Sequence, residues 1–146
     1  MQIDHVELFV PDRHEAARWY EAALGLKILR EHEDWAAHPE GPLMISSDGG
    51  HSKLALFAGA PRGNRETAGH HRVAFRTEGQ KFLRFLDHLE QFPIFDEAGQ
   101  RVTRRKVVDH DKAFSIYFCD PYGHRYEVTT YDYDYTVTHL SQLNKK

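Results

Sequence analysis

One pattern constrains this chain more than any other: the order of strand-like and helix-like segments in residues 3–58 recurs in residues 71–131. Each copy has the order βαβββ. A single copy leaves one face of its sheet uncovered, so two copies must pair to bury that face. We therefore predict an α+β fold of two βαβββ modules that form an open, eight-strand, barrel-like cleft with the helices packed outside. The predicted organisation is one domain over 1–146, with modules at 1–60 and 69–131 and a tail at 132–146.

The first copy opens with the alternating segment 3–10, IDHVELFV, which is typical of a strand with one apolar face. Asp12 and Glu15 have the spacing of a capping box, and the helix that they open is expected to end at Gly25. Turn and strand signals then predict three more strands, at about 26–31, 42–47 and 52–58.

The second copy follows residues 59–69, GAPRGNRETAG, which are rich in turn formers and are the candidate linker. A strand is predicted at 71–77, and Thr77 with Gln80 is expected to cap the next helix. Further strands are predicted at about 100–108, 113–119 and 124–131. The basic run Arg101 to Lys106 is interpreted as the wet face of a strand, and the tail is expected to form a short helix at Leu140–Leu143 or to fray.

The two copies also align residue by residue. The segment His5-Val6-Glu7-Leu8-Phe9 lies over Arg72-Val73-Ala74-Phe75-Arg76, and Asp48 to Ala55 lies over Asp120 to Glu127. His5 therefore corresponds to Arg72, and Ala55 corresponds to Glu127.

Composition excludes several classes of function. The 146 residues carry a net charge of −3 with both signs mixed, which is not the pattern of a nucleic-acid-binding or membrane-surface protein. No apolar stretch approaches the roughly 20 residues of a membrane helix, and MQIDHVELFV lacks the order of a signal peptide. A single cysteine, Cys119, excludes an internal disulfide. We therefore expect a cytoplasmic protein with no nucleic-acid or membrane partner.

The segments DHVELFVPDRHEAARWYEAALGL and DHDKAFSIYFCDPYGHRYEVTTYD together resemble the vicinal oxygen chelate superfamily. This superfamily includes glyoxalase I, extradiol dioxygenases, fosfomycin-resistance transferases and bleomycin-binding proteins, and the resemblance spans nearly the whole chain. It implies a divalent metal (Fe, Mn, Zn or Ni) held by residues of the opening and closing strands. Carried onto this chain, the resemblance places ligands at His5 and Glu127, and His71 is the predicted third ligand.

The position of the superfamily's second histidine is held here by Arg72. A guanidinium has no lone pair to offer a metal. His71 is one residue away and would point to the opposite face unless a β-bulge intervenes, and His70 has the right parity but lies about 6.6 Å along the strand. Either a neighbouring histidine completes the metal site, or Arg72 replaces the metal with a fixed charge paired to Glu127. Both alternatives remain open.

The run from Val108 to Glu127 is similar to the extradiol dioxygenase signature. This resemblance implies that His110 is an acid/base group, that Tyr117 is a hydrogen-bond donor and that Glu127 is a ligand; Asp109 and Asp111 are expected only to keep the loop around His110 in water. The resemblance to glyoxalase I would imply four metal ligands, one of them a carboxylate at the first module's counterpart of Glu127. That counterpart is Ala55 here, so glyoxalase chemistry is disfavoured.

Two hypotheses follow. The first is a metal-dependent enzyme, of extradiol-dioxygenase or lyase type, that acts on a small substrate with adjacent oxygens. The second is a metal-free protein of the bleomycin-resistance type that binds a drug or a polar aromatic molecule. Arg72, Glu7 and Arg76 share the parity of the cleft face and are the predicted substrate-binding residues. A homodimer is expected, because the superfamily often pairs modules between subunits.

Overall fold

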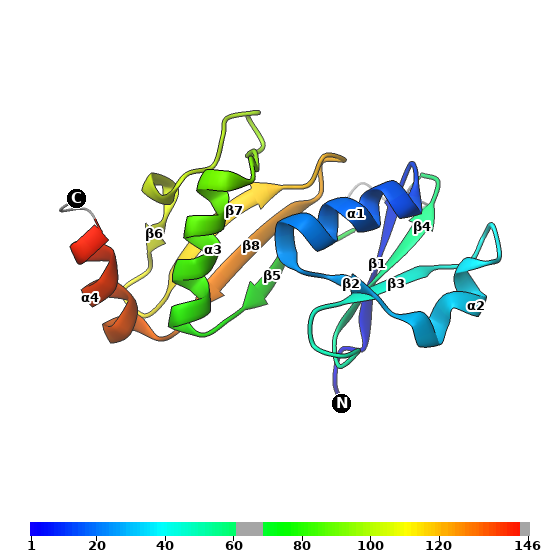
Figure 1. Cartoon of the computed structure of the whole chain (residues 1–146), viewed down its shortest axis with the longest axis horizontal. Coiled ribbons are helices and arrows are strands. Elements are labelled where there is room, and N and C mark those ends of the chain that lie inside the picture. Colours follow the sequence, from blue (N-terminus) through cyan, green and yellow to red (C-terminus); the bar gives the residue numbers. More distant parts are fainter. Residues whose placement is uncertain (61–68, 144–146) are drawn as a thin grey trace. The chain divides into compact units, whose positions relative to one another are not determined.

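The computed structural model describes residues 1–60 and 69–143 and divides the chain into two compact units, Met1–Ala68 and Gly69–Lys146. Each unit holds a four-stranded mixed sheet with its helices (Figure 1). The first unit contains β1 (His5–Val10), α1 (Arg13–Leu24), β2 (Lys27–Ile28), a 3₁₀ helix η1 (Arg30–His32), α2 (Glu33–Ala36), β3 (Leu43–Ser46) and β4 (Lys53–Ala58). The second contains β5 (Val73–Arg76), α3 (Gly79–Gln91), a 3₁₀ helix η2 (Arg104–Lys106), β6 (Val108–Asp109), β7 (Phe114–Cys119), β8 (Arg125–Thr130) and α4 (Tyr133–Leu143).

The two sheets have the same topology, which confirms the α+β fold with two βαβββ modules. Their strand orders are β1-β4-β3-β2 and β5-β8-β7-β6, and in each sheet the first strand pairs in parallel with the last. The register also repeats: Glu7 lies beside Ala55 in the first sheet, and Ala74 lies beside Glu127 in the second. The predicted linker 59–69 lies mostly outside the described residues.

Helices α1 and α3 each pack on one face of the sheet in their own unit. On β1, Leu8 and Val10 are buried while His5 and Glu7 are exposed, so the helix-facing side has the predicted parity. In the second unit, Phe82 and Leu86 of α3 are fully buried, and Phe85 contacts Phe118 of β7 with ring centroids 5.8 Å apart. The apolar residues thus collect between helix and sheet, and in the second unit the opposite sheet face carries polar residues such as Tyr117 and Glu127.

Helix α1 begins and ends where the sequence predicts. The Asp12 carboxylate accepts a hydrogen bond from the Glu15 backbone at 2.9 Å, and Gly25 ends the helix with φ 70°. Only glycine adopts this left-handed conformation at little cost, so the ending is encoded locally.

The strand predicted at 26–31 is mostly wrong. Only Lys27–Ile28 pair as β2, and η1 and α2 follow. The Leu29 N–H still donates to the Met44 carbonyl at 2.9 Å, and the chain then turns into η1, where the His32 N–H donates to the Leu29 carbonyl at 3.2 Å. Further on, the Arg13 guanidinium donates to the backbone carbonyls of Ala36, His38 and Gly41 and fixes the end of α2 and the turn after it.

The strand predicted at 100–108 is also wrong over most of its length. Residues 104–106 form η2, and only Val108–Asp109 pair with β7. Arg104 and Lys106 bind the carboxylates of Asp87 and Asp96, while Val102 is completely buried. The basic run is therefore tied to the protein's own acidic groups and is not the wet face of a strand.

The predicted capping of α3 and the predicted tail are corrected together. The N-cap residue Glu78 makes no side-chain capping bond; instead the Gly79 backbone N–H donates to the Asp132 carboxylate at 2.7 Å. The tail forms the longer helix α4, from Tyr133 to Leu143, rather than a short helix at Leu140–Leu143 alone, and α4 packs against α3. None of the helices formed by the described residues is long and apolar enough to cross a membrane.

Candidate functional site

The sheet face of the second unit that α3 leaves uncovered carries most of the predicted site residues. Tyr117 of β7 lies opposite Glu127 of β8, and Ala74 lies on the other side of Glu127. Directly paired residues share a face of a sheet, so Tyr117 and Glu127 point to the same side. Arg72 immediately precedes β5 and extends over this face.

The predicted site residues His110 and Tyr117 lie in contact. The His110 Nε2 atom lies 2.9 Å from the Tyr117 hydroxyl, which is hydrogen-bonding distance in either histidine tautomer. The Arg72 guanidinium lies over the Tyr117 ring at 4.6 Å from its centroid, a cation–π contact. Tyr117 therefore connects a group that can exchange a proton with a group that carries a fixed positive charge.

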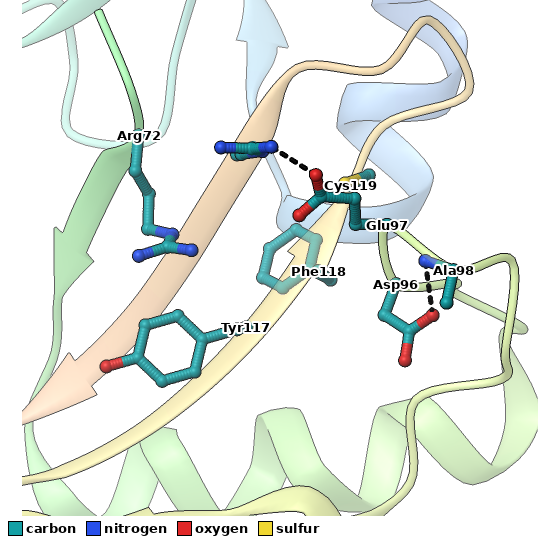
Figure 2. Close-up of a pocket in the computed structure, with 8 residues that line it drawn as sticks. Arg72, Asp96, Glu97, Ala98, Tyr117, Phe118 and Cys119 are labelled. Atoms are coloured by element: carbon teal, nitrogen blue, oxygen red, sulfur yellow. Dashed lines mark hydrogen bonds and ion pairs between the residues drawn. The ribbon is translucent and has the colours of Figure 1, made fainter.

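A cavity of about 240 Å³ lies beside these residues and belongs entirely to the second unit. Figure 2 shows Arg72 and Tyr117 on one side of it and the 96–98 loop on the other. Its lining residues are Arg72, Asp96, Glu97, Ala98, Tyr117, Phe118, Cys119 and Arg125. The volume suits a small molecule of the size of one substituted ring.

The charges around this cavity are not equivalent. Arg125 pairs with Glu97, and its other guanidinium nitrogen donates to His71 Nδ1 at 2.8 Å. Among residues 1–60 and 69–143, Arg72 forms no ion pair, and in particular none with Glu127. Arg72 is thus the lining cation whose charge an anionic ligand would balance.

The surroundings of Cys119 disfavour a reactive thiolate. Burial raises the pKa of its thiol above the ordinary value, and the neighbouring Glu97 acts in the same direction. A thiol that stays protonated is a poor nucleophile. On the 96–98 loop, the hydrogen bond from Lys106 lowers the pKa of Asp96. The resulting ion pair between Lys106 and Asp96 stabilises this loop.

The residues at the expected second-histidine position do not fit a metal. Arginine is always a donor, so the 2.8 Å contact makes Nδ1 of His71 the acceptor. A neutral imidazole has one nitrogen lone pair, and in His71 this lone pair faces Arg125 instead of a metal. Arg72 has none. Within the described residues, no group of three or more His, Cys, Asp and Glu side chains gathers as metal ligands would.

The predicted residues of the first unit stand on its own sheet. His5 Nδ1 lies 2.8 Å from the Asp4 carboxylate and Nε2 lies 3.5 Å from that of Glu7. Both His5 and Glu7 are exposed on the face away from α1. Since Glu127 belongs to the second unit, the structure brings His5 together with Glu7 and brings Glu127 together with Tyr117.

Arg76 lies at the other end of β5 from Arg72, about 13 Å along the strand. Its guanidinium stacks over Tyr131 at 5.0 Å, in a second cavity of about 350 Å³. The predicted substrate-binding residues Arg72 and Arg76 are therefore separated, and only Arg72 borders the His110–Tyr117 pair.

Sequence reasoning missed three residues that shape this face. Glu97 balances Arg125 from a loop, and Asp109 accepts a hydrogen bond from the Tyr133 hydroxyl at 2.8 Å. Asp109 is therefore not merely a solvated loop residue as predicted. The Asp109-Tyr133 contact joins β6 to α4, and no local pattern announces a partner so far along the chain.

Comparison with known proteins agrees with this geometry. The family model described as "Glyoxalase/Bleomycin resistance protein/Dioxygenase superfamily" matches residues 2–128. No curated protein matches the chain.

Several solved structures have a similar fold. A glyoxalase/dioxygenase from Nostoc punctiforme is 22% identical, with a TM-score of 0.58 over 88% of this chain and 90% of that one. A lactoylglutathione lyase from Agrobacterium tumefaciens is 17% identical, with a TM-score of 0.60 over 88% and 92%. The fosfomycin resistance protein FosX from Mesorhizobium loti is 15% identical, with a TM-score of 0.56 over 88% and 91%. At these identities the likeness establishes the fold alone.

Proposed function

This chain belongs to the Glyoxalase/Bleomycin resistance protein/Dioxygenase superfamily, and from that premise we propose that it binds a small anionic aromatic molecule with adjacent oxygens on the second unit, with Arg72 as the charged anchor. The observation that carries the proposal is the Arg72 guanidinium, held over the Tyr117 ring at 4.6 Å beside the 240 Å³ cavity.

The chemistry of the lining supports this class of ligand. Tyr117 offers the edge of its ring, or the ring face that Arg72 leaves open, to an aromatic body. A guanidinium binds a carboxylate with two parallel hydrogen bonds, which fixes orientation as well as charge. Because Glu97 balances Arg125, the second arginine of the cavity is less available to a ligand than Arg72.

Salicylate is a suitable probe, since its carboxylate and hydroxyl oxygens sit on adjacent ring carbons. In an NMR titration, salicylate is expected to shift the backbone signals of residues around Arg72 and Tyr117. Arg72→Ala should weaken binding about 10-fold or more, because a hydrogen-bonded charged contact contributes about 1.5–3 kcal/mol. Arg72→Lys should be intermediate, since an ammonium keeps the charge but loses the planar fork.

Arg105→Ala is the matched control, because Arg105 is an exposed arginine on η2 in the same unit and its loss changes the net charge equally. It should bind salicylate as the wild type does. Equal binding by Arg72→Ala and the wild type would contradict the proposal.

The proposal is metal-independent because residues 71 and 72 do not supply the expected donor. We expect purified protein to hold much less than one equivalent of metal, even after incubation with Fe(II), Mn(II), Zn(II) or Ni(II), when elemental analysis is used. One equivalent that disappears in both His5→Ala and Glu127→Ala would instead support the predicted metal enzyme with His5 and Glu127 as ligands.

A second candidate function is proton-transfer catalysis on the same bound molecule. It is favoured by the 2.9 Å contact between His110 Nε2 and the Tyr117 hydroxyl, on the face that carries Glu127. In this proposal His110 takes or returns a proton of the substrate, and Tyr117 donates a hydrogen bond to a substrate oxygen. The expected homodimer and cytoplasmic location stay predictions.

A further inference from the structure

His110 occupies a tight turn between β6 and β7 that is internally strained. The backbone N–H of His110 donates to the Ala113 carbonyl at 2.9 Å. The next residue, Asp111, has φ 65°, in the left-handed region that a non-glycine residue enters at a cost of roughly 1–2 kcal/mol. Such a conformation persists only where surrounding contacts impose it.

Asp109 supplies those contacts. One of its carboxylate oxygens accepts a hydrogen bond from the Asp111 backbone at 2.8 Å, across the strained turn. The other accepts from the Tyr133 hydroxyl of α4, also at 2.8 Å. One carboxylate therefore connects the turn that bears His110 to the C-terminal helix.

Helix α4 is itself fixed at two points. The Tyr133 ring stacks on Phe114 of β7, with centroids 4.9 Å apart and planes 15° apart. The adjacent Asp132 accepts the hydrogen bond from Gly79 at the start of α3. Tyr133 is thus a rigid donor, not a surface side chain that happens to meet Asp109.

We propose that Asp109 and Tyr133 are positioning residues, which hold the 109–113 turn so that the His110 imidazole meets the Tyr117 hydroxyl. The inference rests on the proposed role of the His110–Tyr117 pair, but its geometry is independent of any ligand. Helix α4 contributes to this role because its first residue, Tyr133, donates the hydrogen bond to Asp109.

The protonation state of Tyr133 is consistent with this role. The hydrogen bond to Asp109 raises the pKa of Tyr133 above its ordinary value. The phenol therefore remains a donor to the carboxylate throughout the neutral range.

Tyr133→Phe tests the inference with the smallest change, since it removes the hydroxyl and keeps the ring that stacks on Phe114. The readout is the ring ¹⁵N signals of His110 in histidine-labelled protein, which report its tautomer and its contact with Tyr117. The ratio of contacting to free His110 rings is expected to fall about 10-fold, as the loss of one hydrogen bond to a charged group predicts. Tyr135→Phe, a tyrosine of the same helix whose ring stacks on His139, is the control and should leave the signals unchanged.

A rescue variant separates positioning from general damage. Adding Asp111→Gly to Tyr133→Phe removes the cost of the left-handed turn, so the His110 signals should move back toward the wild type. If Tyr133→Phe proves poorly folded by circular dichroism, Asp109→Asn gives the same measurement, because it removes the charge that both donors approach. Wild-type His110 signals in a folded Tyr133→Phe or Asp109→Asn variant would overturn the inference.

The same samples distinguish the failure of this inference from that of the proposed function. Changed His110 signals together with no salicylate binding by the wild type would uphold positioning and refute the ligand class. Unchanged His110 signals together with Arg72-dependent binding would refute positioning and uphold the ligand class.

Discussion

Replacing Phe82 with alanine is expected to lower the free energy of unfolding of the second unit by about 3–5 kcal/mol. Phe82 is fully buried on α3, at the junction of the helix with the sheet that carries the site. Truncation to alanine removes the buried ring and leaves a cavity that the surrounding strands fill only partly.

The measurement is urea unfolding followed by two signals. Trp19 and Trp35 both belong to the first unit, so tryptophan fluorescence follows that unit while far-ultraviolet circular dichroism follows both. The dichroism transition should move to lower urea in Phe82→Ala. Phe95→Ala is the control, because Phe95 is 48% exposed; a change of equal size in the two variants would contradict the assigned core.

His110→Gln is expected to lower the rate of substrate proton exchange by about 100-fold or more, the usual contribution of a positioned acid/base group. Phenylpyruvate is the probe, because it is an aromatic anion that carries carbonyl and carboxylate oxygens on adjacent carbons. NMR in D₂O follows the loss of its carbon-bound protons. Glutamine keeps hydrogen-bonding capacity at this position but cannot exchange a proton near neutral pH.

Tyr117→Phe should reduce the same rate to a smaller extent, because it removes a hydrogen-bond donor and leaves His110 in place. His14→Gln is the control, because His14 is an exposed residue of α1 in the first unit, and it should leave the exchange rate unchanged. A wild-type rate no faster than that of an equal concentration of free imidazole would eliminate the catalytic candidate and leave the binding proposal standing.

The parts of the fold that the sequence predicts are those determined by neighbouring residues. Alternation in residues 3–10 is enough to orient β1, and Asp12 and Gly25 determine the ends of α1 through bonds within one helical turn. The duplication adds a second constraint, since the register that places Glu7 beside Ala55 also places Ala74 beside Glu127. These relations need no knowledge of distant contacts.

The parts that the sequence mispredicts depend on partners far along the chain. Arg13 organises the carbonyls of residues 36–41, and Asp132 caps a helix that begins 53 residues earlier. The run Arg101 to Lys106 contains valine and threonine, which favour strands. Its residues 104–106 nevertheless form a 3₁₀ helix, in which Arg104 pairs with Asp87 and Lys106 pairs with Asp96. In each case a tertiary contact outweighs the local preference.

The candidate site divides in the same way. The resemblance singles out His110 and Tyr117, and the structure places His110 Nε2 2.9 Å from the Tyr117 hydroxyl. The sheet faces on which Arg72 and His71 lie could not be predicted. Alternation along a strand assigns a residue to one face only when it is known whether a β-bulge interrupts the strand. The roles of Glu97 and Tyr133 come from a loop and from a helix that the sequence left undefined.

The shared register has a consequence for how the duplicated modules have diverged. In the first module Glu7 lies on the edge strand β1 and Ala55 lies on the inner strand β4. In the second module the two residue types are exchanged, with Ala74 on the edge strand β5 and Glu127 on the inner strand β8. Superposing the modules therefore places Glu7 on Ala74 and Glu127 on Ala55. Although the modules share one fold, the acidic group stands on a different strand in each, so each sheet presents different chemistry to a ligand.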